Sequence, residues 1–173
     1  MMRADLFNPF IVAAGEVLAR EAGVQVTRGA LTLQRETHVT DDVTVIIGLV
    51  GDVSGMVFYG MSLATAMGVV SHILGEEMND FDKLAQSGVA ELGNVIAGQA
   101  CIGLSELGLD VKLSVPTLLI GKGSRISTLD IERLIVPLET ELGTLRIDLA
   151  LRESRSNSRQ RADGPVQMVA HPA

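Results

Sequence analysis

Hydrophobic and polar positions alternate with a helical period in three segments of this chain. After Asn8-Pro9, apolar residues recur every three or four positions, which predicts a helix with Asn8 as its N-cap and Pro9 at its first helical position. Gly23 is expected to end this helix. A serine cap and a terminal glycine bound the second segment, while an aspartate and Gly108 bound the third, which is the longest. We therefore expect helices at 8–23, 62–75 and 82–106.

Shorter apolar runs predict strands, because they are rich in β-branched residues and end at glycine, proline or aspartate. The first three runs lie in succession and are expected to form an antiparallel meander. One helix, three strands, two helices and further strands follow each other along the chain. This order predicts an α+β fold, with helices layered on a mostly antiparallel sheet. The expected strands are 24–33, 43–50, 55–61, 111–113, 117–120, 131–137 and 144–151.

The C-terminal segment 152–173 differs from the body in composition and charge. It holds four arginines against two carboxylates, so the net charge of −7 divides into −9 for 1–151 and +2 for 152–173. Residues 153–165 show no apolar periodicity and are rich in Ser, Arg and Asn. We therefore expect a domain at 1–151 and a disordered basic tail at 152–173. Docking of the tail on an acidic partner or a membrane surface is the alternative.

Composition excludes several classes of function. Hydrophobic residues make up 47% of the chain, enough for a globular core, but aromatic residues make up only 3% and tryptophan is absent. Because the body is also acidic, base stacking and phosphate neutralisation are poorly provided for, and nucleic acid is not an expected partner. The most apolar stretch, 43–50, is far shorter than the roughly 20 residues of a membrane span. With one cysteine and no leader pattern, the chain is expected to be cytoplasmic and not membrane-bound.

The helix expected at 82–106 has three distinct faces at about 100° per residue. A broad apolar arc that includes Leu92 and Ile96 is expected to face the sheet. A stripe of small residues that includes Gly93 and Ala97 would allow a second helix to approach closely. The third face is polar, and both its asparagine and its glycines are unfavourable in a helix interior, which indicates a functional surface; an ordinary solvated stripe is the alternative. This polar line consists of Ser87, Glu91, Asn94, Gly98 and Ser105.

The sequence shows little sign of a metal site or of a catalytic nucleophile. His38, His72 and His171 have no carboxylate or cysteine at ligand spacing, so solvated or capping roles are favoured and no metal site is expected. Cys101 has no neighbouring base and is expected to be a buried structural thiol. The glycine-rich run 121–124 lacks the remaining spacing of a phosphate loop, which favours a hairpin turn.

Residues 84–98 resemble the signature helix of the CheC and CheX chemotaxis phosphatases. That signature is Ser or Asp, three residues, Glu, two residues and Asn, and it matches at Ser87, Glu91 and Asn94. The resemblance extends over about residues 5–151. Only one such motif is present, which favours the one-site CheX form over the two-site CheC form. Further matching segments are 8–10, 43–48, 55–57 and 114–117, followed by Gly121.

The resemblance implies an enzyme that hydrolyses the aspartyl phosphate of a CheY-like response regulator. Asn94 would position the attacking water and Glu91 would contact the regulator's active-site lysine, with Ser87 and Gly98 in the partner-binding surface. The regulator would hold Mg²⁺, so this chain would bind no cofactor of its own. The resemblance also implies a homodimer with a continuous sheet, formed through strand edges. A departure is Val115, where many relatives have proline.

Two other functions are compatible with the same sequence. One is a non-catalytic module of the same fold that binds a receiver domain or a flagellar-switch component. The other is a structural dimeric domain with an exposed polar stripe. The presence of both Glu91 and Asn94 favours the enzyme, because a module without turnover would be free to lose Asn94.

Overall fold

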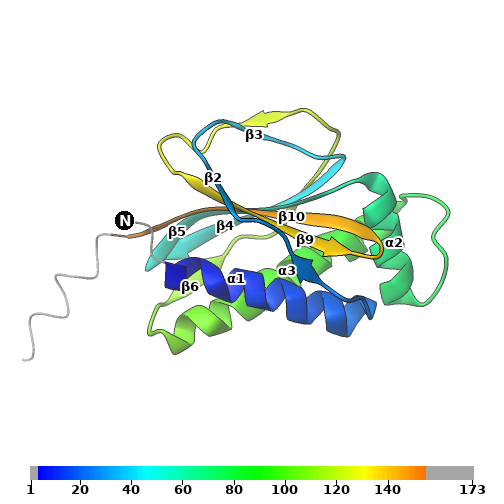
Figure 1. Cartoon of the computed structure of the whole chain (residues 1–173), viewed down its shortest axis with the longest axis horizontal. Coiled ribbons are helices and arrows are strands. Elements are labelled where there is room, and N and C mark those ends of the chain that lie inside the picture. Colours follow the sequence, from blue (N-terminus) through cyan, green and yellow to red (C-terminus); the bar gives the residue numbers. More distant parts are fainter. Residues whose placement is uncertain (1–3, 155–173) are drawn as a thin grey trace, which may run out of the picture.

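The computed structural model describes residues 4–154, which form helices packed on a mostly antiparallel sheet (Figure 1). This α+β architecture confirms the expected fold class. Helices α1 and α3 lie against each other on one face of the large sheet, and the segment that carries β3 arches over the other face. No helix within the described residues is both long and apolar enough to cross a membrane. The helical elements are α1 Ala4–Val17, the π-helical turn η1 Leu18–Ala22, α2 Leu63–Leu74 and α3 Lys83–Glu106.

The large sheet has the order β1-β9-β10-β5-β4-β6, with β2 also pairing with β9 and β7 also pairing with β4. All of these pairs are antiparallel. A second, two-stranded sheet consists of β3 and β8. The strands are β1 Thr27–Arg28, β2 Thr32–Gln34, β3 His38–Val39, β4 Val43–Gly51, β5 Val53–Met61, β6 Val111–Leu113, β7 Thr117–Ile120, β8 Arg125–Ile126, β9 Arg133–Thr140 and β10 Gly143–Glu153.

The first helix begins earlier than predicted. It starts at Ala4, and Pro9 lies inside it, so the expected cap at Asn8 is wrong. The added turn buries Leu6 and Phe7, which are 4% and 2% exposed. Burial of two such side chains outweighs the helical hydrogen bond that a proline cannot donate. The predicted end is correct, because Gly23 is the left-handed C-cap with φ 64°.

The predicted three-strand meander is also wrong. Residues 24–33 form two short pieces that pair with β9, and only β4 and β5 form the expected hairpin. The break comes at Gly29, whose N–H donates to the carbonyl of Pro137 at 2.8 Å. A Cβ at Gly29 would lie 2.7 Å from the Pro137 ring, so a glycine is needed where β9 approaches.

The last strand extends past the expected domain boundary at 151. β10 continues through Glu153, and the N–H of Ser154 donates to the carbonyl of Asp52 at 2.9 Å. Most of the segment expected to be a disordered tail, 155–173, lies outside the described residues. The body therefore has its own hydrogen-bonded end before that segment begins.

The core lies between the sheet and the helices. Strand β4 directs Val43, Val45 and Ile47 inward, and all three are 0% exposed. Helix α3 contributes Val89 and Ile96, also 0% exposed, to the same cluster. Burial of each side chain of this kind contributes about 1.5–3 kcal/mol, so the position of α3 on the sheet is strongly determined.

Candidate active site

Helix α3 begins and ends where local signals predict. The Asp82 carboxylate caps it by accepting the N–H of Ala85 at 2.9 Å, and Gly108 follows its last turn with φ 78°. The helix therefore presents the polar line on a regular backbone, in which positions three and four apart lie on one face.

Gly93 determines how closely α3 approaches the sheet. A Cβ at this position would lie 2.8 Å from Val45 Cγ1 and 3.3 Å from Tyr59 Cδ2. The small-residue stripe was expected to meet another helix, but Gly93 meets the sheet. The close glycine contact with α1 is made by Gly103, where a Cβ would lie 3.1 Å from Pro9 Cβ. The expectation for Gly93 is therefore wrong, because the wheel separates faces without showing which neighbour each face meets.

The structure brings Ser87, Glu91, Asn94 and Gly98 together on one side of α3. Ser87 and Glu91 are exposed, and Asn94 and Gly98 are half-buried. Gly98 lies eleven positions after Ser87, so these four residues extend about 16 Å along the helix. Glu91 and Asn94 lie one turn apart, at the separation at which helical side chains are neighbours.

The side chains of Glu91 and Asn94 have no hydrogen-bond partner within residues 4–154. By contrast, Gln99 on another face of the same helix donates to Glu16 at 2.5 Å and accepts from Arg20 at 3.3 Å. The carboxylate and carboxamide are therefore available to a second molecule. Gly98 adds room beside them, because no atom beyond its chain neighbours and the backbone of its own helix lies within 4 Å of the position that its Cβ would occupy.

The loop between β6 and β7 lies beside α3, since both strands contact this helix. Ser114 holds the loop to β4: its hydroxyl accepts the N–H of Gly48 at 2.8 Å and donates to the carbonyl of Val115 at 3.1 Å. Val115 is 83% exposed. A fixed loop with an exposed aliphatic residue therefore flanks the helix that carries the candidate site.

Cys101 has the properties of a structural thiol. It is half-buried, and burial raises the pKa of its thiol, which keeps it protonated. Burial also raises the pKa of the Tyr59 hydroxyl, which lies in the core beneath α3. Within residues 4–154, no group of three or more His, Cys, Asp or Glu side chains could hold a metal ion.

A buried ionic cluster was missed by the sequence reasoning. His38 is 1% exposed, and its Nδ1 lies 2.8 Å from Asp148 Oδ2, so the expectation of a solvated or capping role is wrong. Arg133 donates to the same carboxylate oxygen at 2.5 Å, and Arg146 donates to Asp148 Oδ1 at 2.9 Å. The His38 ring stacks on Phe58 at 4.4 Å. Arg133 and Asp148 are charged residues at buried positions of β9 and β10, and this pattern could have indicated the cluster.

The other histidines and the glycine-rich run have simpler roles. His72 caps a carbonyl, that of Ala22, at 3.0 Å, as expected, whereas His171 lies outside the described residues. The run 121–124 forms a turn, but β7 before it pairs with β4 and β8 after it pairs with β3. It is therefore a connection between two sheets and not the predicted hairpin.

The polar line combines exposed and half-buried residues on one side of α3. The grooves beside α1 do not include Glu91 or Asn94 among their lining residues. An exposed carboxylate beside a half-buried carboxamide, both without partners within residues 4–154, suits contact with another protein.

Fold and site together define an α+β domain of the CheC/CheX type. The family model for chemotaxis phosphatase CheX matches residues 43–139, so the chain belongs to the CheX family of phosphatases. It is 30% identical over 128 residues, which is 73% of this chain and 83% of the relative, to the CheY-P phosphatase CheX of Thermotoga maritima. The expected family and phosphatase class are confirmed.

Solved structures agree with this assignment. The chemotaxis protein CheX from Desulfovibrio desulfuricans superposes with a TM-score of 0.76 at 26% identity, over 86% of this chain and 99% of that one. CheX in the CheX-CheY-BeF3-Mg²⁺ complex from Borrelia burgdorferi superposes with a TM-score of 0.76 at 31% identity, over 87% of this chain and 100% of that one.

Proposed function

We propose that this chain hydrolyses the aspartyl phosphate of a CheY-like response regulator. The name of the Thermotoga relative as a CheY-P phosphatase and the CheX-CheY complex from Borrelia support this substrate. The observation that carries the proposal is the pair Glu91 and Asn94, one turn apart on an exposed helix face and without partners within residues 4–154.

Asn94 has the chemistry to orient the attacking water. Its carboxamide carries a donor and an acceptor, so it can hold a water in line with the phosphorus without any change of protonation. Water attacks phosphorus, the bond from phosphorus to the aspartyl oxygen breaks, and the products are inorganic phosphate and the free carboxylate. Because an acyl phosphate is already activated, positioning and charge stabilisation supply most of the catalysis.

Glu91 has the chemistry to fix the register of the two proteins. Its exposed carboxylate would form a charge-assisted hydrogen bond with a lysine of the regulator. Ser87 and Gly98 would frame the contact, one turn or more from the reacting groups on either side. Mg²⁺ would belong to the acidic pocket of the regulator, in accord with the ion in the Borrelia complex, and this chain would bind no cofactor.

The experiment follows the loss of phosphoaspartate from a CheY-like regulator of the same cell. We expect Asn94→Ala to abolish the acceleration while binding survives, and Glu91→Gln to weaken both binding and turnover. Asn79→Ala and Glu77→Gln are matched controls, because both residues are exposed and lie in the turn before α3. Binding without acceleration by the unaltered chain would show a non-catalytic module and refute the proposal. Normal turnover by both variants would refute the assigned roles.

We further propose a cytoplasmic homodimer joined through strand edges. Cytoplasmic location suits a chemotaxis phosphatase whose substrate is a signalling protein. The described sheet ends in short edge strands, β1 and β2 on one side and β6 and β7 on the other, which offer unpaired backbone groups for a second copy. Light scattering should give twice the chain mass of 18.3 kDa at micromolar concentration; a mass of one chain would count against the dimer.

A further inference from the structure

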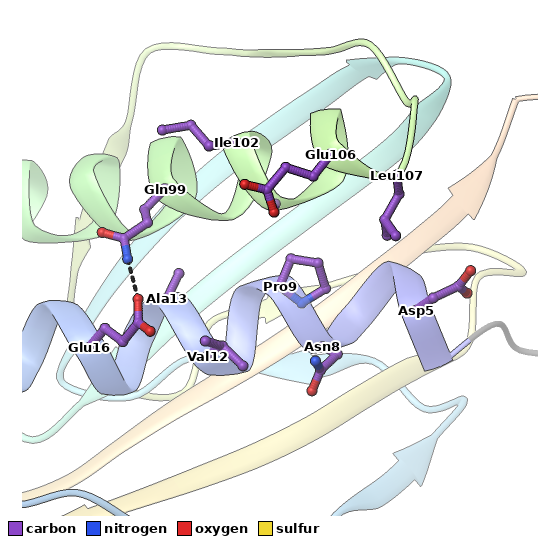
Figure 2. A pocket seen from close by; sticks show the side chains of 11 residues that line it. Asp5, Asn8, Pro9, Val12, Ala13, Glu16, Gln99, Ile102, Glu106 and Leu107 are labelled. Carbon is purple, nitrogen blue, oxygen red and sulfur yellow. Dashed lines mark hydrogen bonds between the residues drawn. The ribbon is translucent and has the colours of Figure 1, made fainter.

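A groove of about 520 Å³ runs between α1 and the C-terminal half of α3 (Figure 2). Its apolar side chains include Val12, Ile102 and Leu107, which are 46%, 63% and 51% exposed. These are large exposed fractions for aliphatic residues that lie close together. The groove therefore presents an apolar surface that a second segment of chain could cover.

The same groove is acidic. Asp5, Glu16 and Glu106 are among its lining residues, and none of the residues that line it is lysine or arginine. Figure 2 shows Asp5 at one end of the groove and Glu16 toward the other, both on α1, with Glu106 on α3 between them. An apolar surface bordered by three carboxylates favours an occupant that carries both aliphatic side chains and positive charge.

The described chain ends beside this groove. The N–H of Ser154 donates to the carbonyl of Asp52, and the side chain of Asp52 accepts the N–H of Asp110 at 2.9 Å. Asp110 lies three residues after Leu107, a lining residue of the groove. Figure 1 shows the last strand leaving the body at the end where α1 begins. Residues that follow Ser154 therefore start within reach of Asp5 and Glu106.

Segment 155–169 has the composition that this groove requires. Arg155, Arg159 and Arg161 come first, and Val166 and Met168 follow. From Asp5 to Glu16 the groove extends about 16 Å along α1, because a helix rises about 1.5 Å per residue. An extended chain covers about 3.3 Å per residue, so Arg155 to Arg161 can span that length with chain to spare.

We propose that segment 155–169 docks into the groove between α1 and α3 of its own chain. The arginines lie against the carboxylates of Asp5, Glu16 and Glu106, and the aliphatic side chains cover Val12 and Ile102. Ile102 lies four residues after Gly98 on the same side of α3, so the groove adjoins the C-terminal end of the polar line, whereas Glu106 lies about 18 Å along the helix from Asn94. Attachment beside the groove gives the segment a high local concentration, so weak contacts suffice to hold it.

A paramagnetic label on the segment tests this proposal in the full-length chain. Ser158→Cys carries the label in a Cys101→Ala background, and methyl signals of Val12 and Ile102 are recorded. We expect these signals to broaden relative to those of Leu74, which lies on α2 at the opposite end of the molecule. Unbroadened groove signals would overturn the proposal.

Removing carboxylates from the groove distinguishes docking of the segment from chance proximity of its label to the groove. The pair Glu16→Gln and Glu106→Gln should lower the ratio of docked to free segment about tenfold at low salt, since two exposed ion pairs are lost. Glu76→Gln with Glu77→Gln removes the same charge from an exposed turn and should leave the broadening intact. Equal broadening in both pairs would refute the assigned contacts. Broadening of unlabelled chains mixed with labelled ones would show exchange with a second copy and overturn docking within one chain.

Discussion

Two glycines of α3, the buried Gly93 and the half-buried Gly98, offer a direct test of how this helix is positioned. Gly93→Ala and Gly98→Ala make the same substitution five residues apart on one helix. Alanine in a helix interior is favoured over glycine by about 1 kcal/mol, and this gain applies to both variants. The environments differ, because a Cβ at Gly93 meets Val45 and Tyr59, whereas a Cβ at Gly98 meets nothing within 4 Å.

The contacts determine the expected magnitudes. Val45 Cγ1, at 2.8 Å, is part of a stiff β-branched side chain in a buried strand, so it cannot move aside cheaply. Overpacking of this kind costs about 1–3 kcal/mol. Gly93→Ala should therefore lose about 1 kcal/mol of unfolding free energy, and Gly98→Ala should gain about 1 kcal/mol. The melting temperatures of the two variants should differ by about 4–8 °C.

Thermal and chemical unfolding of both variants provide the measurement. Equal stability of the two variants would refute the argument that Gly93 sets the distance between α3 and the sheet. Turnover adds a second reading, since Gly98 lies in the proposed partner surface. Gly98→Ala should raise the KM for the phosphorylated regulator with little change in kcat, and an unchanged KM would remove Gly98 from that surface.

Three other predictions concern stability and reactivity. Asp148→Asn should lower the free energy of unfolding by about 3–5 kcal/mol in denaturant titrations, since it leaves Arg133 buried without its counter-charge; a loss below about 1 kcal/mol would contradict this. Burial raises the pKa of the Cys101 thiol, so less thiolate is present at pH 8 in the folded chain than in the unfolded chain. Cys101 should therefore be alkylated more slowly in the folded chain, with a rate that rises as pH rises. Equal rates in the folded and unfolded chains would contradict its burial. Ser62→Ala removes the oxygen that accepts the N–H of Thr65 at 3.1 Å and should lower the free energy of unfolding by about 1 kcal/mol. The melting temperature should then fall by about 2–4 °C, and an unchanged melting temperature would show that the cap contributes nothing.

Local signals in the sequence predicted the elements that depend on local chemistry. The start of α2 at Ser62, its end at Gly75 and the start of α3 at Asp82 depend on hydrogen bonds between residues close in sequence. The polar line was predictable for the same reason, because all of its members lie on one helix and their spacing alone places them on one side.

Features that depend on distant residues were not predictable in the same way. The partner of residues 24–33 is β9, more than one hundred residues away, and nothing near Gly29 indicates this. The start of α1 depends on burial of Leu6 and Phe7 against elements that come later in the chain. His38 contacts Asp148 only because β3 is folded back over the sheet. The residues near His38 in the sequence therefore do not indicate this contact.

The position of Glu91 and Asn94 on one side of α3, outside the grooves beside α1, has a consequence for selectivity. The three grooves beside α1 include neither residue, so none of them would hold a phosphate monoester or acetyl phosphate against Asn94. In the proposed reaction, discrimination among phosphorylated molecules would come from the fit between two protein surfaces, and an inhibitor would have to compete with the regulator for the surface around Glu91 and Asn94.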